Sequence, residues 1–302
     1  MQTALVLSGG GLKGVAHLGV WQVLKENNIQ IDGVVGTSAG SIAAAAIALG
    51  LNPEELLTEI KKLKPRDLYD LPWWVFLLWE LLQILPQRQF KANALVTLPK
   101  GLLTGKKLMN WLTTVFSNID MGKIDFPLAI TATDINSAKS FVFISKGLEP
   151  AIPDHYAPES AGKTIYIANE KLVQAMRAST SIPGVFAPIQ RGSSLLVDGG
   201  VTNNLPADIM AACGFKKILA VDLGQQDNLK KPVSNIVDIS VKAIEILIQS
   251  TSQVTSKAYC DLTLTPQTGS IALWDLAAID RAFEAGQKAA IAALPEIINT
   301  FS

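Results

Sequence analysis

The sequence predicts a three-layer α/β/α fold with a largely parallel central sheet, on three observations. Apolar, β-branched runs at 3–8 and 30–35 each end in glycines, and a helical pattern follows each run. Further strand candidates recur between helical stretches along the chain, and this alternation is typical of crossover connections between parallel strands. Hydrophobic residues make up 49% of the chain and charged residues 17%, so the apolar excess must lie in a core, a lipid site or a membrane-facing surface.

The elements follow one another without an internal repeat or a low-complexity linker, which predicts one domain over 1–302. The first predicted helix spans about 12–27, with apolar residues at the helical spacing, and the second is rich in alanine and runs to about Leu49. The remaining predicted strands are 127–133, 140–145, 194–197 and 216–222. The remaining predicted helices are about 53–63, 105–116, 169–178, 205–213, 233–250 and 276–294.

Charge and cysteine content exclude several classes of protein. The 26 basic and 26 acidic residues balance, whereas a nucleic-acid-binding domain normally carries a basic excess. Cys213 and Cys260 form no CxxC pair, so we expect no structural zinc and no disulfide framework. Nothing in the sequence resembles a cluster of hard-cation or zinc ligands, so we expect no metal, and we expect no other cofactor. The first residues lack a signal-peptide pattern, and no apolar run reaches the roughly 18 residues of a spanning helix. We expect a cytoplasmic protein, with peripheral membrane contact as a possibility.

The segment 61–107 differs from the rest of the chain. Its centre, 71–86, has Glu80 as its sole charged residue and contains Trp73, Trp74 and Trp79, three of the six tryptophans. The whole segment has nine basic and three acidic residues, so its charge is +6 and the remainder of the chain carries −6. Two interpretations stay open: a buried helix, or a cap or membrane-contact segment in which tryptophans lie at the headgroups and basic residues such as Arg88 and Lys91 meet anionic lipid.

The sequence Gly36-Thr37-Ser38-Ala39-Gly40 is a GxSxG motif between a predicted strand and a predicted helix. A sharp strand-to-helix turn exposes Ser38, and the two glycines let the backbone pass closely. The N-terminus of the following helix directs amide groups toward negative charge that develops near the serine. Ser38 is therefore a candidate nucleophile.

A glycine loop, Gly9 to Gly14, follows the first strand and opens the first helix. Its consecutive amides are able to form an oxyanion hole, and Lys13 adds positive charge. Gly9, Gly11 and Gly14 also satisfy the dinucleotide-binding pattern GxGxxG, with Asp32 at 18 residues beyond Gly14. In that fold, however, the ribose-binding acid follows the second strand, whereas Asp32 precedes or begins it.

The third element is Asp198-Gly199-Gly200, directly after an apolar run and before Asn203-Asn204-Leu205-Pro206. An acid at a strand end followed by glycines can reach a site, although a turn aspartate that caps the next helix gives the same pattern. The chain has two histidines, His17 and His155, and neither follows Asp198 as the histidine of an α/β-hydrolase triad would. We expect His17 to pack or cap within the first helix and His155 to lie in an exposed loop.

Together, the glycine loop, GTSAG, the stretch RASTSIPG at 177–184, and DGG followed by N-x-P resemble the patatin-like phospholipase family. The resemblance covers most of the chain up to about residue 225 and implies a Ser–Asp dyad, with Ser38 as nucleophile and Asp198 as base. It also implies an oxyanion hole among Gly9, Gly10, Gly11, Lys13 and Gly14, and an elbow flanked by Gly36 and Gly40. Thr133-Asp134 looks like a further family segment, without an assigned role.

The resemblance implies hydrolysis of acyl esters in phospholipids or related lipids through an acyl-enzyme, with a lipid as the partner and no nucleic acid. Three alternatives remain. A lipid acyltransferase shares the acyl-enzyme and differs in the acceptor. A catalytically silent lipid-binding protein would bind lipid at its apolar surfaces without cleaving it. An NAD-type oxidoreductase would use the glycine loop for a dinucleotide.

Overall fold

The computed structural model describes residues 2–68, 70, 100–150, 164–224, 236–269, 271 and 275–301. Its strands are β1 (Thr3–Leu7), β2 (Gly33–Gly36), β3 (Gly101–Leu103), β4 (Leu128–Asp134), β5 (Lys139–Ile144), β6 (Ile165–Ile167), β7 (Gly184–Phe186), β8 (Ile189–Arg191), β9 (Ser194–Asp198), β10 (Lys217–Val221) and β11 (Leu262–Leu264). Its helices are α1 (Val15–Glu26), α2 (Ala39–Ala48), α3 (Pro53–Lys62), α4 (Pro65–Leu68), α6 (Lys106–Phe116), α7 (Leu172–Ser179), α8 (Ala207–Ala212), α9 (Ile236–Tyr259), α10 (Ile279–Ala292) and α11 (Leu294–Phe301), with short 3₁₀ turns η1 (Gly11–Gly14), η3 (Met121–Lys123), η5 (Gly199–Val201) and η7 (Leu276–Ala278).

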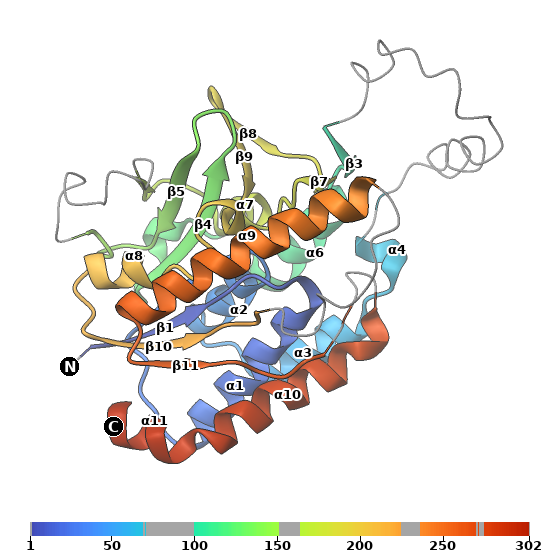
Figure 1. The fold of residues 1–302 in the computed structure, drawn as a ribbon. Helices are drawn as coiled ribbons and strands as arrows, with labels where there is room; N and C mark the ends of the chain where they lie inside the picture. Colours follow the sequence, from blue (N-terminus) through green and yellow to red (C-terminus); the bar gives the residue numbers. More distant parts are fainter. Residues whose placement is uncertain are drawn as a thin grey trace, which may run out of the picture.

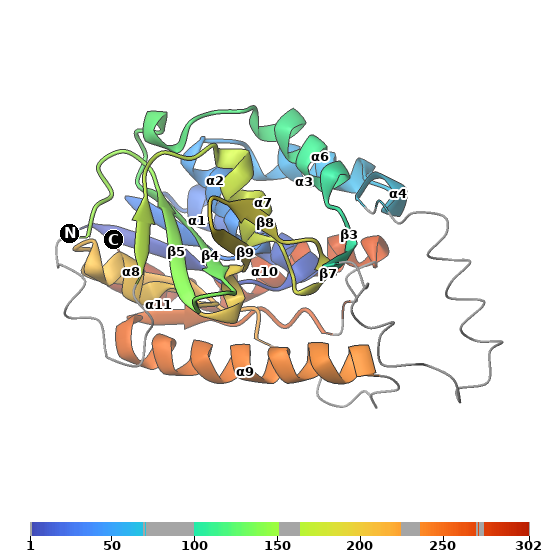
Figure 2. The ribbon, with the colours of Figure 1, turned by 90° about the horizontal axis from the view of Figure 1, so that it is seen from above.

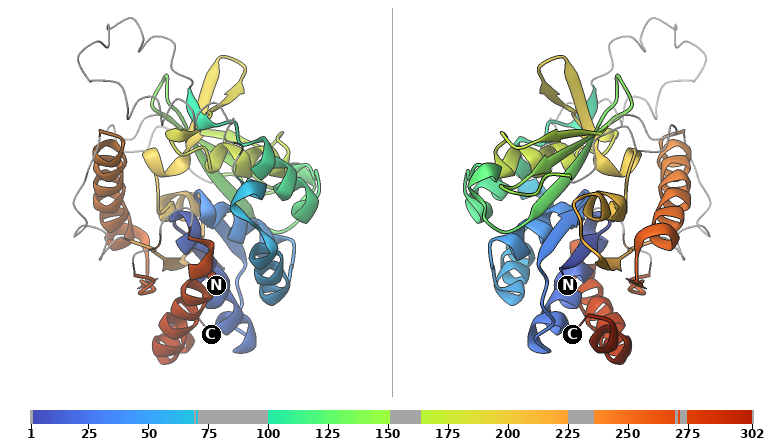
Figure 3. Two further views of the ribbon diagram at one scale, coloured as in Figure 1. Left: turned by 90° about the vertical axis from the view of Figure 1, so that its right-hand side faces the viewer. Right: turned by 90° about the vertical axis from the view of Figure 1, so that its left-hand side faces the viewer.

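Three layers are visible in the ribbon, with helices on both faces of one sheet (Figure 1). Seen from above, α9 runs along one face while α2, α3 and α6 cover the other (Figure 2). The side views show the same separation, with α9 on one side of the strands and α3 and α6 on the other (Figure 3). Strand β1 explains why both faces are covered: Leu5 and Leu7 belong to one buried cluster, and Ala4 and Val6 belong to the other.

The main sheet has the strand order β11-β10-β1-β2-β4-β5-β6, which confirms the predicted α/β fold with a largely parallel sheet. The antiparallel pairs are β4–β5, β4–β9 and β8–β9. The four residues between β4 and β5 are too few for a crossover, so that pair must be antiparallel. Five strands were missed by the sequence patterns, namely β3, β6, β7, β8 and β11, and each has three residues, too short to show a periodicity.

Strand register brings β9 end to end with β2. Strand β5 pairs with β4 along Ala129–Asp134, so it occupies one edge of β4. On the other edge, β2 pairs with β4 as far as Gly36 opposite Ile130, and β9 begins its pairing with Asp198 opposite Ala132. Because β9 is antiparallel to β4, its last residue meets the last residue of β2. This register places Asp198 beside the turn that follows Gly36.

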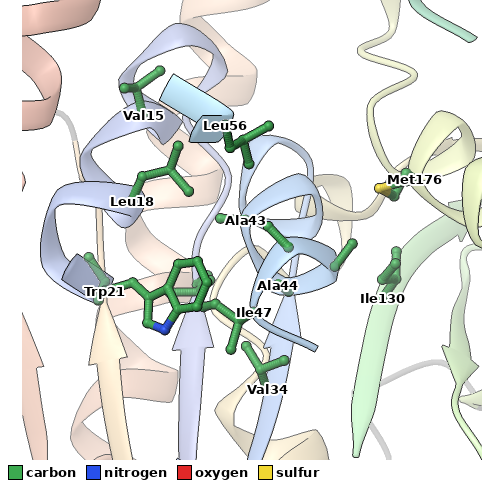
Figure 4. Close-up of a cluster of buried hydrophobic side chains, with 14 of the residues drawn as sticks. Val15, Leu18, Trp21, Val34, Ala43, Ala44, Ile47, Leu56, Ile130 and Met176 are labelled. Atoms are coloured by element: carbon green, nitrogen blue, oxygen red, sulfur yellow. The ribbon is translucent and has the colours of Figure 1, made fainter. Parts of the chain in front are cut away.

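Helices α1, α2 and α3 contribute to the core on one face of the sheet. Figure 4 shows Leu18 and Trp21 of α1, Ala43 of α2 and Leu56 of α3 among this cluster. Helices α1 and α10 approach closely, because a Cβ added at Gly286 would lie 2.0 Å from the carbonyl oxygen of Ala16. Glycine at this position allows the two helix backbones to touch.

The predicted helices agree with the structure except at their ends. Helix α9 continues to Tyr259 instead of ending near 250, since 251–259 contains neither glycine nor proline to stop it. The predicted helix 276–294 is divided into η7 and α10, and α11 follows. The predicted contact residues Trp73, Trp74, Trp79, Arg88 and Lys91, and also His155, lie outside the described residues. Within the part of the chain that the structure describes, no helix is long and apolar enough to cross a bilayer.

Candidate active site

Ser38 lies in a strained turn between β2 and α2. Its backbone angles are φ 53° and ψ −124°, a region that residues with a Cβ rarely adopt. A Cβ at Gly36 would lie 2.2 Å from the Gly40 carbonyl oxygen, and one at Gly40 would lie 2.4 Å from the Leu7 carbonyl oxygen. Gly36 therefore lets the turn close on itself, and Gly40 lets the turn pack against β1.

Asp198 lies next to Ser38 at the end of β9 and is 7% exposed. Burial raises the pKa of its carboxyl group to about 6, although hydrogen bonds from the Ser38 hydroxyl and the Gly200 amide act in the opposite direction. The Gly200 nitrogen lies 2.8 Å from a carboxylate oxygen of Asp198. A Cβ at Gly199 would lie 2.2 Å from the Thr131 hydroxyl, so this glycine lets the Asp198 turn rest on β4.

The glycine loop lies beside Ser38, since a Cβ at Gly9 would be 3.1 Å from the Ser38 Cβ. Two of its amides already have partners. The Gly9 amide donates to Asn204 Oδ1 at 3.1 Å, and the Lys13 amide donates to the Gly10 carbonyl oxygen at 3.2 Å. Gly14 is a packing glycine, because a Cβ there would meet the Ala39 Cβ at 2.4 Å. Of the residues predicted for the oxyanion hole, Gly10 and Gly11 are left as the candidates.

His17 holds the base of this loop. It is fully buried, and its Nε2 lies 2.8 Å from the Ser8 carbonyl oxygen. Burial lowers the pKa of His17 to about 4, so the neutral ring donates through Nε2 at ordinary pH. The Ser8–Gly9 peptide is thus held at its carbonyl by His17 and at its N–H by Asn204. His17 has a packing role, as expected from the sequence, and is not aimed at Ser38.

The stretch RASTSIPG supports the site from α7, in contacts that the sequence patterns did not reveal. Ser179 Oγ accepts a hydrogen bond from the Ser38 amide at 2.8 Å, which holds the strained residue in place. The Ser181 carbonyl accepts from the Asp198 amide at 2.9 Å. One short segment therefore contacts the backbone of both members of the candidate dyad. The only sequence signal was the position of this stretch in the motif order.

Arg177 is buried at 1% exposure, and its guanidinium contacts four other residues. Its guanidinium donates to the carbonyl oxygens of Thr104, Gly105 and Ala187 and to Ser181 Oγ. Burial lowers the pKa of Arg177 to about 10, and the charge of Asp70 opposes that shift. Because these carbonyls belong to the turn before α6 and the end of β7, Arg177 fixes one wall of the site.

Asp134 has a structural role. Its carboxylate accepts hydrogen bonds from the Leu195 amide at 3.0 Å, the Asn136 amide at 3.3 Å and the Ser137 hydroxyl at 2.6 Å. It therefore ties the β4–β5 turn to β9. Its ionised form accepts these bonds, and the pKa of Asp134 is lowered although burial alone would raise it.

Asp32 lies at the wrong end of the sheet for dinucleotide binding. One of its carboxylate oxygens accepts the Thr3 amide at 2.8 Å, where β1 begins. The glycine loop follows the other end of β1. A ribose bound at the glycine loop is thus out of reach of Asp32, which disfavours the oxidoreductase alternative.

An apolar cavity of about 140 Å³ reaches Ser38 and Gly11. Five helices contribute to its walls, together with the α7–β7 connection and β7 itself. Its remaining lining residues are Leu12, Gly14, Val15, Leu18, Ala39, Ile42, Ala43, Leu56, Ile60, Leu63, Leu68, Leu108, Trp111, Thr180, Ile182, Val185 and Phe186. Such a cavity suits an aliphatic ligand.

Residues 5–211 match the patatin-like phospholipase family model. The chain belongs to the patatin-like phospholipase family. Members of this family are generally serine hydrolases. The family match contains Ser38, Asp198, the glycine loop and Asn204, and it ends before α9.

This patatin-like chain is similar to several curated proteins. It is 27% identical to an uncharacterized NTE family protein of Mycobacterium tuberculosis, over 98% of this chain and 47% of that protein. It is 29% identical to the uncharacterized protein YqhO of Bacillus subtilis, over 76% of this chain and 74% of that protein. Human patatin-like phospholipase domain-containing protein 6 is 27% identical over 74% of this chain and 13% of its own length. The chain thus spans about half the length of the mycobacterial relative.

The solved structure of VipD from Legionella pneumophila has a similar fold. Its TM-score is 0.50 at 14% sequence identity, and the match covers 98% of this chain and 67% of VipD. At this identity the likeness concerns the fold alone.

Proposed function

We propose that this patatin-like chain hydrolyses acyl esters of phospholipids or related lipids through a Ser38–Asp198 dyad. The observation that carries the proposal is the hydrogen bond between the strained Ser38 and the buried carboxylate of Asp198. Ser38 also lines the apolar cavity. The serine and the carboxylate supply a nucleophile and a base, and the cavity accepts an aliphatic chain.

In the proposed reaction, Ser38 Oγ attacks the ester carbonyl carbon while its proton passes to Asp198. The amides of Gly10 and Gly11 donate to the oxyanion of the tetrahedral intermediate. Collapse of this intermediate breaks the bond to the alcohol, which leaves with the proton from Asp198. Water then attacks the acyl-enzyme while Asp198 accepts its proton. As the bond between the acyl group and Ser38 breaks, Asp198 returns the proton to Ser38 Oγ, and the fatty acid is released.

The environment of Asp198 makes a carboxylate a workable base. A general base is most effective when its pKa lies near the working pH, and burial raises the pKa of Asp198 to about 6. Direct contact with Ser38 removes the need for an intervening histidine. His17, the one histidine among the described residues, is hydrogen-bonded to the Ser8 carbonyl oxygen instead.

Labelling with a fluorophosphonate tests the dyad. We expect the wild type to be labelled, Ser38→Ala to be unlabelled and Asp198→Asn to react far more slowly. Ser140→Ala on β5 and Asp32→Asn at the opposite end of β2 are matched controls that should label like the wild type. Undiminished labelling of Ser38→Ala would place the nucleophile elsewhere, and an unlabelled wild type would favour a silent lipid-binding protein.

The molecule that accepts the acyl group from the acyl-enzyme distinguishes a hydrolase from an acyltransferase. Turnover in ¹⁸O-labelled water should place one heavy oxygen in the released fatty acid if water attacks the acyl-enzyme. Transfer of the acyl group to a second lipid, without free fatty acid, would instead identify an acyltransferase.

We further propose that the tryptophan-rich, basic segment contacts membranes, on the strength of its sequence. Changing Trp73, Trp74 and Trp79 to Ala, with Arg88 and Lys91 to Glu, should weaken binding to anionic vesicles and spare activity on a short soluble ester. Equal loss on soluble and vesicle substrates would contradict membrane contact.

A further inference from the structure

The apolar cavity follows helix α2 away from Ser38. Ala39, Ile42 and Ala43 line it, which is the spacing of one helical face. Ala43 lies one turn beyond Ala39, about 6 Å along the helix axis. A chain that starts at the Ser38 hydroxyl therefore has α2 as a continuous wall.

The side chains of α2 that line the cavity include two alanines, and the larger side chains of neighbouring helices project toward them. Ala43 belongs to α2, whereas Leu18 and Leu56 come from α1 and α3, and all three line the cavity. Figure 4 shows these side chains next to one another between the three helices. A larger residue at position 43 would therefore fill the space between α2 and the opposite wall.

The chemistry of the walls selects the part of the ester that enters. Among the described lining residues, Ser38, Thr180 and Trp111 carry a polar side-chain group, and none is charged. The Thr180 hydroxyl already donates to the Met176 carbonyl oxygen at 2.9 Å. A phosphate or a charged headgroup would find no counter-charge on these walls, whereas an alkyl chain fits them.

We propose that this cavity binds the acyl chain of the substrate and that Ala43 sets the chain length the enzyme accepts. The proposal rests on the proposed ester hydrolysis at Ser38. It predicts that the longer acyl chains extend past Ala39 to the level of Ala43, Leu18 and Leu56.

The test compares kcat/KM for p-nitrophenyl dodecanoate and p-nitrophenyl butyrate. In Ala43→Leu, the ratio of the long to the short ester should fall at least about tenfold, because each methylene that loses its apolar contact weakens transition-state binding. The matched control is Ala48→Leu, at the end of α2 and away from the cavity, which should keep the wild-type ratio. An unchanged ratio in Ala43→Leu overturns the proposal.

A compensating change guards against simple misfolding. Leu56→Ala enlarges the same cavity from the α3 side, so it should raise the relative rate on the longest esters and restore the ratio when combined with Ala43→Leu. If Leu56→Ala leaves chain-length preference unchanged, the cavity is not the acyl site. Failure of the proposed function looks different, because the wild type would then hydrolyse neither ester and resist the fluorophosphonate.

A second inference comes from the hydrogen bonds of Asn204. This side chain is 6% exposed, accepts from the Gly9 amide at 3.1 Å and donates to Ser252 Oγ at 3.1 Å. Ser252 is 1% exposed on α9, beyond the residues that match the family. One turn earlier on α9, Ile248 contacts the same region, since a Cβ at Gly200 would lie 3.5 Å from its Cδ1.

We infer that Asn204 is a positioning residue, which holds the glycine loop against the turn that carries Asp198, and that Ser252 of α9 fixes the orientation of its amide. The Asn204 oxygen must face Gly9 and its nitrogen must face Ser252, because an amide rotated by half a turn would present its N–H groups to the Gly9 N–H. The outer helix α9 thereby contributes to the geometry of the candidate oxyanion hole.

Steady-state kinetics distinguish positioning from general support of the fold. Asn204→Ala should lower kcat by between about tenfold and a hundredfold with little change in KM, and slow fluorophosphonate labelling of Ser38 in proportion. Ser252→Ala should have a smaller effect of the same kind, and Gln253→Ala, on the exposed side of α9, should have none. A reduced Tm with unchanged kcat in Asn204→Ala would overturn the inference.

Discussion

Replacing Asp198 by Asn should make the protein more stable and nearly inactive. Asp198 is buried, and its pKa is raised from 3.8 to about 6, which means that the folded protein holds the ionised carboxylate less well than water does. Above pH 6 the wild type therefore carries a buried charge that destabilises it. The isosteric amide removes this charge, retains an oxygen for the Gly200 amide and cannot accept the Ser38 proton.

The magnitude follows from the pKa. A shift of about two units corresponds to about 3 kcal/mol at pH 8, at 1.36 kcal/mol for each unit. Because folding raises the pKa of this acid, the loss of stability depends on pH in one direction. It is absent below the unfolded pKa of 3.8, grows as the pH rises to about 6, and is constant above pH 6. For a chain of 302 residues, about 3 kcal/mol corresponds to an increase in Tm of about 5 °C. Loss of the base should lower kcat/KM on the order of 10²- to 10⁴-fold.

Urea unfolding of wild type and Asp198→Asn at pH 8 and at pH 4.5 measures both the size and the pH dependence. The stabilisation at pH 8 should shrink to about 1 kcal/mol at pH 4.5, where the folded wild type is already protonated at this position. Asp32→Asn is the control for a generic change of charge. A destabilised Asp198→Asn at pH 8, or one that keeps wild-type activity, would refute the assignment of Asp198 as a desolvated base.

Four further predictions concern the site and its support. The wild-type kcat/KM should fall tenfold per unit below about pH 6, where Asp198 takes up a proton, and a rate independent of pH between 4 and 7 would contradict its role as the base. Ser38→Gly should be about 1 kcal/mol more stable than Ser38→Ala in urea unfolding, because φ of 53° strains any residue with a Cβ; equal stabilities would argue against strain. His17 is neutral when folded, so relative to His17→Gln the wild type should lose about 3 kcal/mol as the pH falls from 6.5 to about 4, and parallel pH curves would exclude this linkage. Gly286→Ala should lower the unfolding free energy by about 2 kcal/mol, because its Cβ would meet the Ala16 carbonyl oxygen; a neutral result would show that α10 can shift.

Local sequence signals were strong wherever the backbone conformation at a position requires a particular residue type. The GxSxG motif located the turn at Ser38 because that turn needs glycine on both sides, and the alternation of strand and helix predicted the sheet. The strands of three residues and the antiparallel placement of β9 were not visible, because neither leaves a periodic pattern. The roles of Asn204 and Ser179 were equally hidden, since their partners are Gly9 and Ser38, far away along the chain.

The sequence by itself determined the fold class, the family and the two candidate catalytic residues, because glycine motifs and apolar periodicity are local properties of the chain. Only the tertiary structure decided how they meet. Strands β2 and β9 share one edge of β4, and this register brings Asp198 to Ser38. Burial at that junction, which depends on every layer around it, raises the pKa of Asp198 and turns an ordinary carboxylate into a candidate base.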